Sequence, residues 1–139
     1  MSFLLDTNVV SEWTKAQPNR GVLTWLADVD EDRTFLSVVT LAELRHGVER
    51  LPASKHRLRL DEWLRGALLM RFEARVLPVD AAVADEWGRI VSRCESRGKP
   101  ISTMDAFVAA TASVRALTLV TRNTKDFEFA LKAVLNPWT

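Results

Sequence analysis

The chain has 139 residues, and its 19 basic and 18 acidic side chains leave a formal net charge of +1. This length suits a single domain, residues 1–139, that buries roughly two thirds of its unfolded surface in one core. The balanced charge excludes a global field that would draw the protein onto nucleic acid or a membrane, so any nucleic-acid binding must come from a local patch.

Short β-like runs are separated by longer segments with helical periodicity. The runs are Phe3–Leu5, Thr34–Val38, Arg75–Val79 and Leu117–Thr121, and Val134–Leu135 predicts a short last strand. Strands that alternate with helices indicate parallel pairing through right-handed crossovers. We therefore expect a doubly wound α/β fold with a central, mostly parallel sheet of four to five strands.

The helical segments follow residues that commonly cap helices. The expected caps and helices are Asn19 before Gly21–Val29, Thr40 before Leu41–Arg50, and Asp80 before Ala81–Arg97. Residues 53–72 place leucines and Trp63 along one side, with charged residues between them. That spacing predicts an amphipathic helix or a helical hairpin.

Acidic residues follow the predicted strands, at the edge where open α/β folds place their sites. Asp6 ends the first run, and alone it is best explained as the N-cap of a helix that begins near Asn8. Glu43 closes the sequence Thr40-Leu41-Ala42-Glu43, which a capping box explains. Asp105 lies in an apolar helix after Ser102, where a charge requires a cation or a donor partner.

A further polar cluster, from Thr121 to Phe127, follows the fourth run. Turn formation and capping by Asn123 explain it structurally. Carboxylate, amide and hydroxyl oxygens that meet at one edge are nevertheless hard ligands, suited to Mg²⁺ or Mn²⁺. Metal-assisted hydrolysis of a phosphodiester uses such a set of acids.

Several motifs lie in order along nearly the whole chain. They are Leu4–Glu12, Ser37–Gly47, Asp105–Ala112, Leu119–Asn123, Asp126–Phe127 and Asn136–Trp138. Together they resemble the PIN-domain ribonuclease toxins of the VapC type, especially their FitB-like branch. The resemblance implies a three-layer α/β/α fold, an Mg²⁺- or Mn²⁺-dependent endoribonuclease, a homodimer, and a small DNA-binding antitoxin from a type II toxin–antitoxin module.

The resemblance assigns the catalytic, metal-binding acids to Asp6, Glu43 and Asp105. The family's fourth and less constant acid falls on Asn123, which is an amide here and leaves open whether a second metal binds firmly. Asp126 is a candidate substitute, and Thr121 and Asn8 are candidate supporting oxygen donors.

The densest positive region of the chain runs from Arg45 to Arg65. A solvated helix face explains much of it, and contact with an RNA backbone is the second interpretation. Arg45, Arg50 and Arg122 are the candidate RNA contacts, whereas His46 is expected to be solvated. We expect the five tryptophans to pack in the core or at a subunit interface rather than to stack on bases.

The predicted function is hydrolysis of RNA by metal-activated water, as the toxin of such a module. The alternative is a catalytically weak binding module that acts on nucleic acid through a partner complex, which the missing fourth acid favours and the three intact acids oppose. A lone cysteine, Cys94, and the lack of a leader or an apolar run of about 20 residues predict a cytoplasmic protein without a membrane segment.

Overall fold

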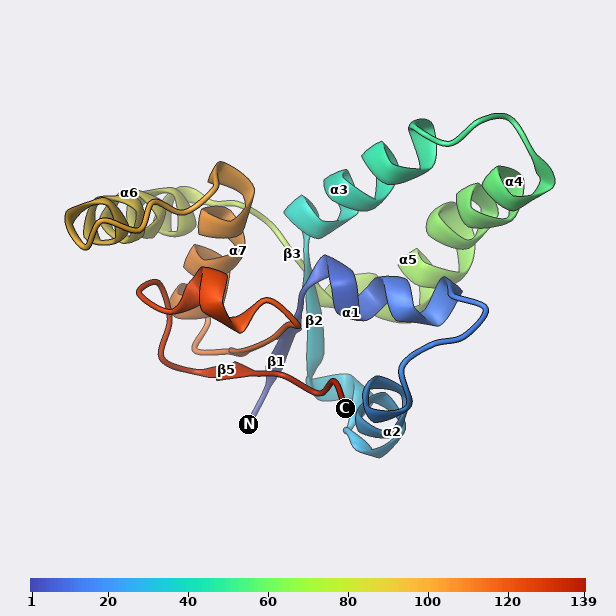
Figure 1. The fold of residues 1–139 in the computed structure, drawn as a ribbon, viewed down its shortest axis with the longest axis horizontal. Coiled ribbons are helices and arrows are strands. Elements are labelled where there is room, and N and C mark those ends of the chain that lie inside the picture. The colour runs from blue at the N-terminus through green and yellow to red at the C-terminus, as the bar shows by residue number, and fades with distance from the viewer.

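The computed structural model describes all 139 residues and contains one sheet of five parallel strands (Figure 1). The strands are β1 (Phe3–Leu5), β2 (Thr34–Ser37), β3 (Val76–Leu77), β4 (Thr118–Val120) and β5 (Val134–Leu135). Their spatial order is β3-β2-β1-β4-β5, and every neighbouring pair is parallel. The chain builds outward from β1 on one side and then, from β4, on the other. The order therefore reverses between β1 and β4, and the carboxyl ends of these two strands border the crevice where such folds bind ligands.

The predicted strands are confirmed, and three of them have shorter bounds than predicted. Each of the four runs contains one strand, and Val134–Leu135 forms β5. β3 has only two residues, because Arg75 belongs to a 3-10 turn and Pro78 has no amide proton for a ladder. β2 ends at Ser37, where the next helix starts.

Helices and turns fill the connections between strands. The helices are α1 (Thr7–Ser11), α2 (Arg20–Asp28), α3 (Val38–Glu49), α4 (Lys55–Glu62), α5 (Leu69–Phe72), α6 (Ala81–Ser96) and α7 (Thr103–Val114). A π-helical segment, Trp63–Leu68, joins α4 to α5, so the amphipathic segment is a continuous but irregular helical run. Short 3-10 turns occupy Glu12–Thr14, Glu31–Arg33, Glu73–Arg75 and Thr124–Phe127. None of the helices is both long and apolar enough to cross a bilayer.

Two of the predicted caps are confirmed and one is wrong. Asn19 accepts from the amide of Val22 at 3.2 Å, and Asp80 accepts from the amide of Val83 at 3.0 Å. Thr40 does not cap α3. The helix begins at Val38, three residues before the predicted start, and the hydroxyl of Ser37 accepts from the amide of Val39 at 3.0 Å. Glu43 is therefore the sixth residue of α3 and not part of a capping box, which leaves its carboxylate available for other contacts.

Two hydrophobic clusters lie on opposite faces of the sheet, which gives three layers. Leu4 and Leu119 belong to a cluster with residues of α6 and α7. Their strand neighbours Leu5 and Val120 belong to a cluster with residues of α1, α2, α3 and α5. Successive side chains of a strand point to opposite faces, which explains the alternation. Figure 1 shows α6 and α7 on one side of the strands and α1, α2, α4 and α5 on the other.

All five tryptophans are half-buried at the margins of these clusters, so the expectation of core packing is confirmed. Trp87 packs against the first cluster, and the other four pack against the second. The ring of Trp87 stacks on Phe107 with centroids 5.4 Å apart, which fixes α6 against α7.

Candidate functional site

Asp6 lies at the carboxyl end of β1, beside the end of β4. Its side chain is 5% exposed. The Oδ1 atom accepts from the amide of Thr7 at 2.8 Å, which confirms the predicted cap of α1. The Oδ2 atom accepts from the hydroxyl of Thr121 at 2.7 Å. Both carboxylate oxygens therefore have fixed donors, one from each side of the strand-order reversal.

Thr121 is the centre of a small hydrogen-bond network. Its hydroxyl oxygen accepts from the Asn8 side-chain amide at 3.3 Å and from the backbone amide of Asn123 at 3.1 Å. The Asn8 carbonyl oxygen in turn accepts from the amide of Arg122 at 3.2 Å. Asn8 and Thr121 thus lie beside Asp6, where the sequence placed them. The prediction that Asn123 caps a helix is wrong, because its side chain makes no capping bond to the turn that follows it.

Glu43 reaches the same edge from α3. The hydroxyl of Thr7, the residue after Asp6, donates to Glu43 Oε1 at 3.1 Å. Thr7 was not among the predicted site residues, although a hydroxyl directly after the first acid was a visible signal. Thr7, the first residue of α1, therefore contacts both carboxylates: its amide donates to Asp6 and its hydroxyl donates to Glu43.

Asp105 and Asp126 complete the acidic edge. Asp105 is the third residue of α7, and its amide donates to the hydroxyl of Ser102 at 3.2 Å, so Ser102 caps this helix. Asp126 lies exposed on the 3-10 turn after β4. Its negative charge contributes to the raised pKa of both Asp6 and Asp105, which places it near this edge.

The three predicted metal-binding acids all have a pKa above the ordinary value. Burial is the main cause of the raised pKa at Asp6, Glu43 and Asp105. Hydrogen bonds from Thr121 and Thr7 lower the pKa of Asp6, and the bond from Thr7 lowers that of Glu43, in both cases less than burial raises it. Repulsion between the acids adds to the rise, since Asp6 and Asp105 both raise the pKa of Glu43. The three carboxylates thus share one electrostatic environment.

These three acids differ from the other acids that are removed from solvent. Six acidic side chains are buried or half-buried. Three form ion pairs: Glu12 with Lys15, Asp61 with Arg45 and Arg65, and Glu86 with Arg89. Asp6, Glu43 and Asp105 have no basic partner, although unpaired charge is costly away from water.

The donor chemistry of this edge fits a hard divalent cation. Carboxylates, hydroxyls and amides are oxygen ligands, and a cation would offset the charge that no side chain neutralises. No three acidic, histidine or cysteine side chains converge into a ready ligand cluster, so the fit lies in charge and donor type. Mg²⁺ in proteins commonly takes one or two carboxylates and keeps several waters, and such binding does not need a closed cage.

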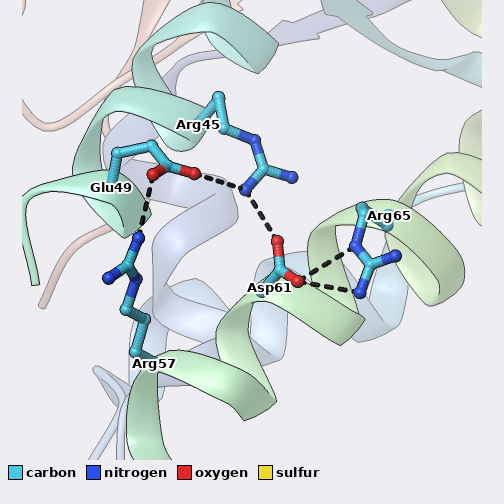
Figure 2. A network of polar contacts seen from close by, with 5 residues as sticks. All are labelled: Arg45, Glu49, Arg57, Asp61 and Arg65. Carbon is cyan, nitrogen blue, oxygen red and sulfur yellow. Dashed lines mark hydrogen bonds and ion pairs between the residues drawn. The ribbon is translucent and has the colours of Figure 1, made fainter. Parts of the chain in front are cut away.

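Of the predicted RNA contacts, Arg45 has a different position from the other two. Its guanidinium donates to Asp61 at 2.7 Å and to Glu49 at 3.2 Å, while Arg57 and Arg65 bind the same two acids (Figure 2). This network links α3 to α4, and its two acids neutralise the charge of Arg45 that the prediction had assigned to RNA. Arg50 and Arg122 remain exposed without ion pairs.

Two hollows of the surface differ in their relation to the acids. The larger, about 740 Å³, is lined by Ala116–Thr118 at the start of β4 and by Glu128–Ala133 before β5, at the opposite edge of the sheet from the site. A smaller groove of about 390 Å³ includes Thr7 and Glu43 in its lining. Only the smaller groove adjoins the site.

Comparison with known proteins agrees with this geometry. A family model described as the PIN domain matches residues 3–131. The toxin FitB of Neisseria gonorrhoeae is 43% identical over 135 residues, which are 97% of this chain and 97% of that protein. The VapC ribonuclease Y4jK of Sinorhizobium fredii is 38% identical over 135 residues, 97% of this chain and 96% of that protein. The structure of FitAB bound to an IR36 DNA fragment superposes with a TM-score of 0.93 at 40% identity, covering 99% of this chain and 96% of that one.

Proposed function

Because the chain belongs to the PIN domain family, within its VapC and FitB group of ribonuclease toxins, we propose that it is a metal-dependent endoribonuclease and the toxin of a type II toxin–antitoxin system. The main support is the set of three unpaired acids, Asp6, Glu43 and Asp105, at the strand-order reversal. The name of the VapC relative supports RNA as the substrate.

In this proposal, Asp6, Glu43 and Asp105 hold Mg²⁺ or Mn²⁺. When bound, such a cation would supply a more acidic water and would neutralise charge on the scissile phosphate. The protein orients two of these carboxylates. The Thr121 hydroxyl holds one oxygen of Asp6, and the Thr7 hydroxyl holds one oxygen of Glu43. Asn123 and Asp126 are supporting residues in the same proposal, and Asp126 adds negative charge beside Asp6.

We further propose a small DNA-binding antitoxin and a second copy of the chain as partners. The relative from Neisseria is named a toxin, and FitAB has been solved on a DNA fragment. An RNA substrate and a DNA-bound complex would both place the protein in the cytoplasm.

The direct test is cleavage of RNA by the purified protein with Mg²⁺, with EDTA, and after Asp6→Asn. Loss of a metal ligand should remove several kcal/mol of transition-state stabilisation, which lowers the cleavage rate roughly a thousandfold. Asp28→Asn is the matched control, because Asp28 is exposed on α2 and has no ion pair. Cleavage undiminished by Asp6→Asn would refute the assignment.

The second candidate is a binding module with little catalysis, which the amide Asn123 at the fourth position favours. Calorimetric titration with Mg²⁺ separates the two. No heat of Mg²⁺ binding, together with retained binding of a protein partner, would support the module. Binding of Mg²⁺ that is lost on Asp6→Asn would support the nuclease.

A further inference from the structure

The groove beside Glu43 runs between α1 and the α3–α4 hairpin. Hydroxyl groups form one wall, contributed by Thr7, Ser11 and Thr14. The other walls include His46 and Arg50 of α3 and Trp63 at the end of α4. Because Glu43 is part of the lining, any ligand in this groove is continuous with the acidic site.

The charge of the groove is suited to an anion with polar edges. Glu43 is the only acid in its lining, and the hydroxyl of Ser11, the imidazole of His46 and the guanidinium of Arg50 supply donors. The hydroxyls of Thr7 and Thr14 already donate within the protein, to Glu43 and to the carbonyl of Ser11, and can only accept from a ligand. Around the groove, the positive charges of Arg45, Arg57 and Arg65 are neutralised by ion pairs with Glu49 and Asp61 (Figure 2). Arg50, which is exposed and lines the groove, has no such partner, so its positive charge is available to a ligand there.

Trp63 occupies an unusual backbone position. It is the first residue of the π-helical segment Trp63–Leu68, and such segments are rare and frequently found at functional sites. Two residues before it, Asp61 is held by Arg45 and Arg65, which fixes the end of α4 against α3. Trp63 is half-buried against the second cluster and also lines the groove, so it packs on the core and still presents part of its surface to a ligand.

We propose that this groove binds single-stranded RNA beside the scissile phosphate, with one base against Trp63 and the adjoining phosphate near Arg50 and His46. The inference rests on the proposed ribonuclease function and assigns its specificity to a residue outside the acidic site. A volume of about 390 Å³ lies at the small end of ligand pockets, suited to one nucleotide. An aromatic face and a cation are the pair that single strands use for binding.

The first test is fluorescence anisotropy with a labelled single-stranded RNA of mixed sequence in EDTA, which prevents metal-dependent cleavage. Trp63→Ala and Arg50→Ala should each weaken binding by about tenfold, and Trp63→Phe should retain most of the affinity. Arg59→Ala is the matched control, because Arg59 is an exposed, unpaired arginine on α4 outside the groove. Its affinity should stay within about twofold of wild type.

The second test is the distribution of cleavage sites on a long RNA with Mg²⁺. A role in specificity predicts that Trp63→Ala changes which positions are cut, whereas Trp63→Phe preserves them; a merely structural role would lower all cuts equally. Unchanged RNA affinity and unchanged cleavage sites in Trp63→Ala and Arg50→Ala would overturn the inference. The inference would also be overturned if these two variants kept their RNA affinity but no longer bound the antitoxin, because the groove would then be a protein-docking site.

The two proposals fail separately. If the wild-type protein cuts no RNA, the ribonuclease function fails, and the anisotropy comparison still decides whether the groove binds RNA. If it cuts RNA with metal and the groove variants behave as wild type, the function stands and the groove inference falls.

Discussion

The hydroxyl of Thr121 donates a hydrogen bond of 2.7 Å to Asp6 Oδ2 and so joins two residues 115 positions apart in the sequence. Asp6 follows β1 and Thr121 follows β4, the two strands between which the sheet order reverses. The bond therefore fixes the first acid of the site to the opposite half of the fold.

Replacing Thr121 by valine removes that donor with little change in shape. Partners that orient a metal-binding carboxylate are typically worth about 10- to 100-fold in metal affinity or activity. We expect Thr121→Val to lower RNA cleavage by that factor, and Thr121→Ser to restore most of it. Rates are compared at saturating Mg²⁺, after both variants are shown to melt cooperatively. Wild-type cleavage by Thr121→Val would show that the orientation of Asp6 is set elsewhere.

The acidic site should destabilise the metal-free protein at neutral pH. Burial raises the pKa of Asp105 above its ordinary value of 3.8, and repulsion from Asp6 and Asp126 adds to the rise. A carboxyl group with a raised folded-state pKa contributes stability that is complete below 3.8 and is lost as the pH rises through the folded-state value. In EDTA, Asp105→Asn should therefore be more stable than wild type at neutral pH, and this advantage should vanish below 3.8.

Mg²⁺ should reverse that order. The ion binds the folded wild type and stabilises it by mass action, whereas the amide variant gains less. Urea unfolding at neutral pH, with EDTA and with Mg²⁺, measures both effects. A variant less stable than wild type in EDTA would contradict the account of the unpaired acids.

The network in Figure 2 predicts the opposite pH dependence at Asp61. Hydrogen bonds from Arg45 and then Arg65 hold the pKa of Asp61 below its ordinary value of 3.8. Its stabilising effect is present above 3.8 and is lost as the pH falls through the lowered folded-state value. We expect Asp61→Asn to lower Tm by at most about 3 °C at neutral pH, because Asp61 is only half-buried, its arginine partners are partly in solvent, and such pairs contribute little.

High salt should shrink the effect of Asp61→Asn further, since charges in contact with solvent are screened. Asp32→Asn, at an exposed acid without an ion pair, is the control and should leave Tm unchanged. If Asp61→Asn lowers Tm by the same amount at low and high salt, packing and not charge holds α4 against α3.

Gly21 marks where the carboxyl terminus docks on α2. A Cβ atom at this position would lie 2.4 Å from the carbonyl oxygen of Pro137, and the Asn19 side chain donates to the carbonyl of Thr139 at 3.1 Å. Gly21→Ala should therefore cost about 1–3 kcal/mol in urea unfolding, because the backbone must shift. Gly88→Ala on α6, with open space around the added methyl, should instead stabilise by about 0.5–1 kcal/mol. Equal effects of the two substitutions would rule out the close approach.

The sequence predicted the elements because their signals are local. Hydrophobic runs located every strand, and Asn19 and Asp80 were recognised as caps because a cap bonds a residue three positions away. The prediction that Thr40 caps α3 was wrong for a related reason. Either Ser37 or Thr40 has a hydroxyl that could cap the helix, and Ser37 is the cap because β2 ends there. The metal-binding role of Asp6, Glu43 and Asp105 stays a prediction, although the structure brings these acids to one edge.

By itself, then, the sequence determined which segments become strands and helices and which of them carry acidic and hydroxyl side chains after a strand, because periodicity and capping act over a few residues. Only the tertiary structure decided which acids are paired with a base and which receive only a hydroxyl group. Arg45 forms an ion pair with Asp61, 16 residues away. Glu43 and Asp6 instead accept hydrogen bonds from Thr7 and Thr121, across separations of 36 and 115 residues. Pairing energies depend on distance and burial in space, and these are fixed only when the sheet order and the α3–α4 hairpin bring remote residues together.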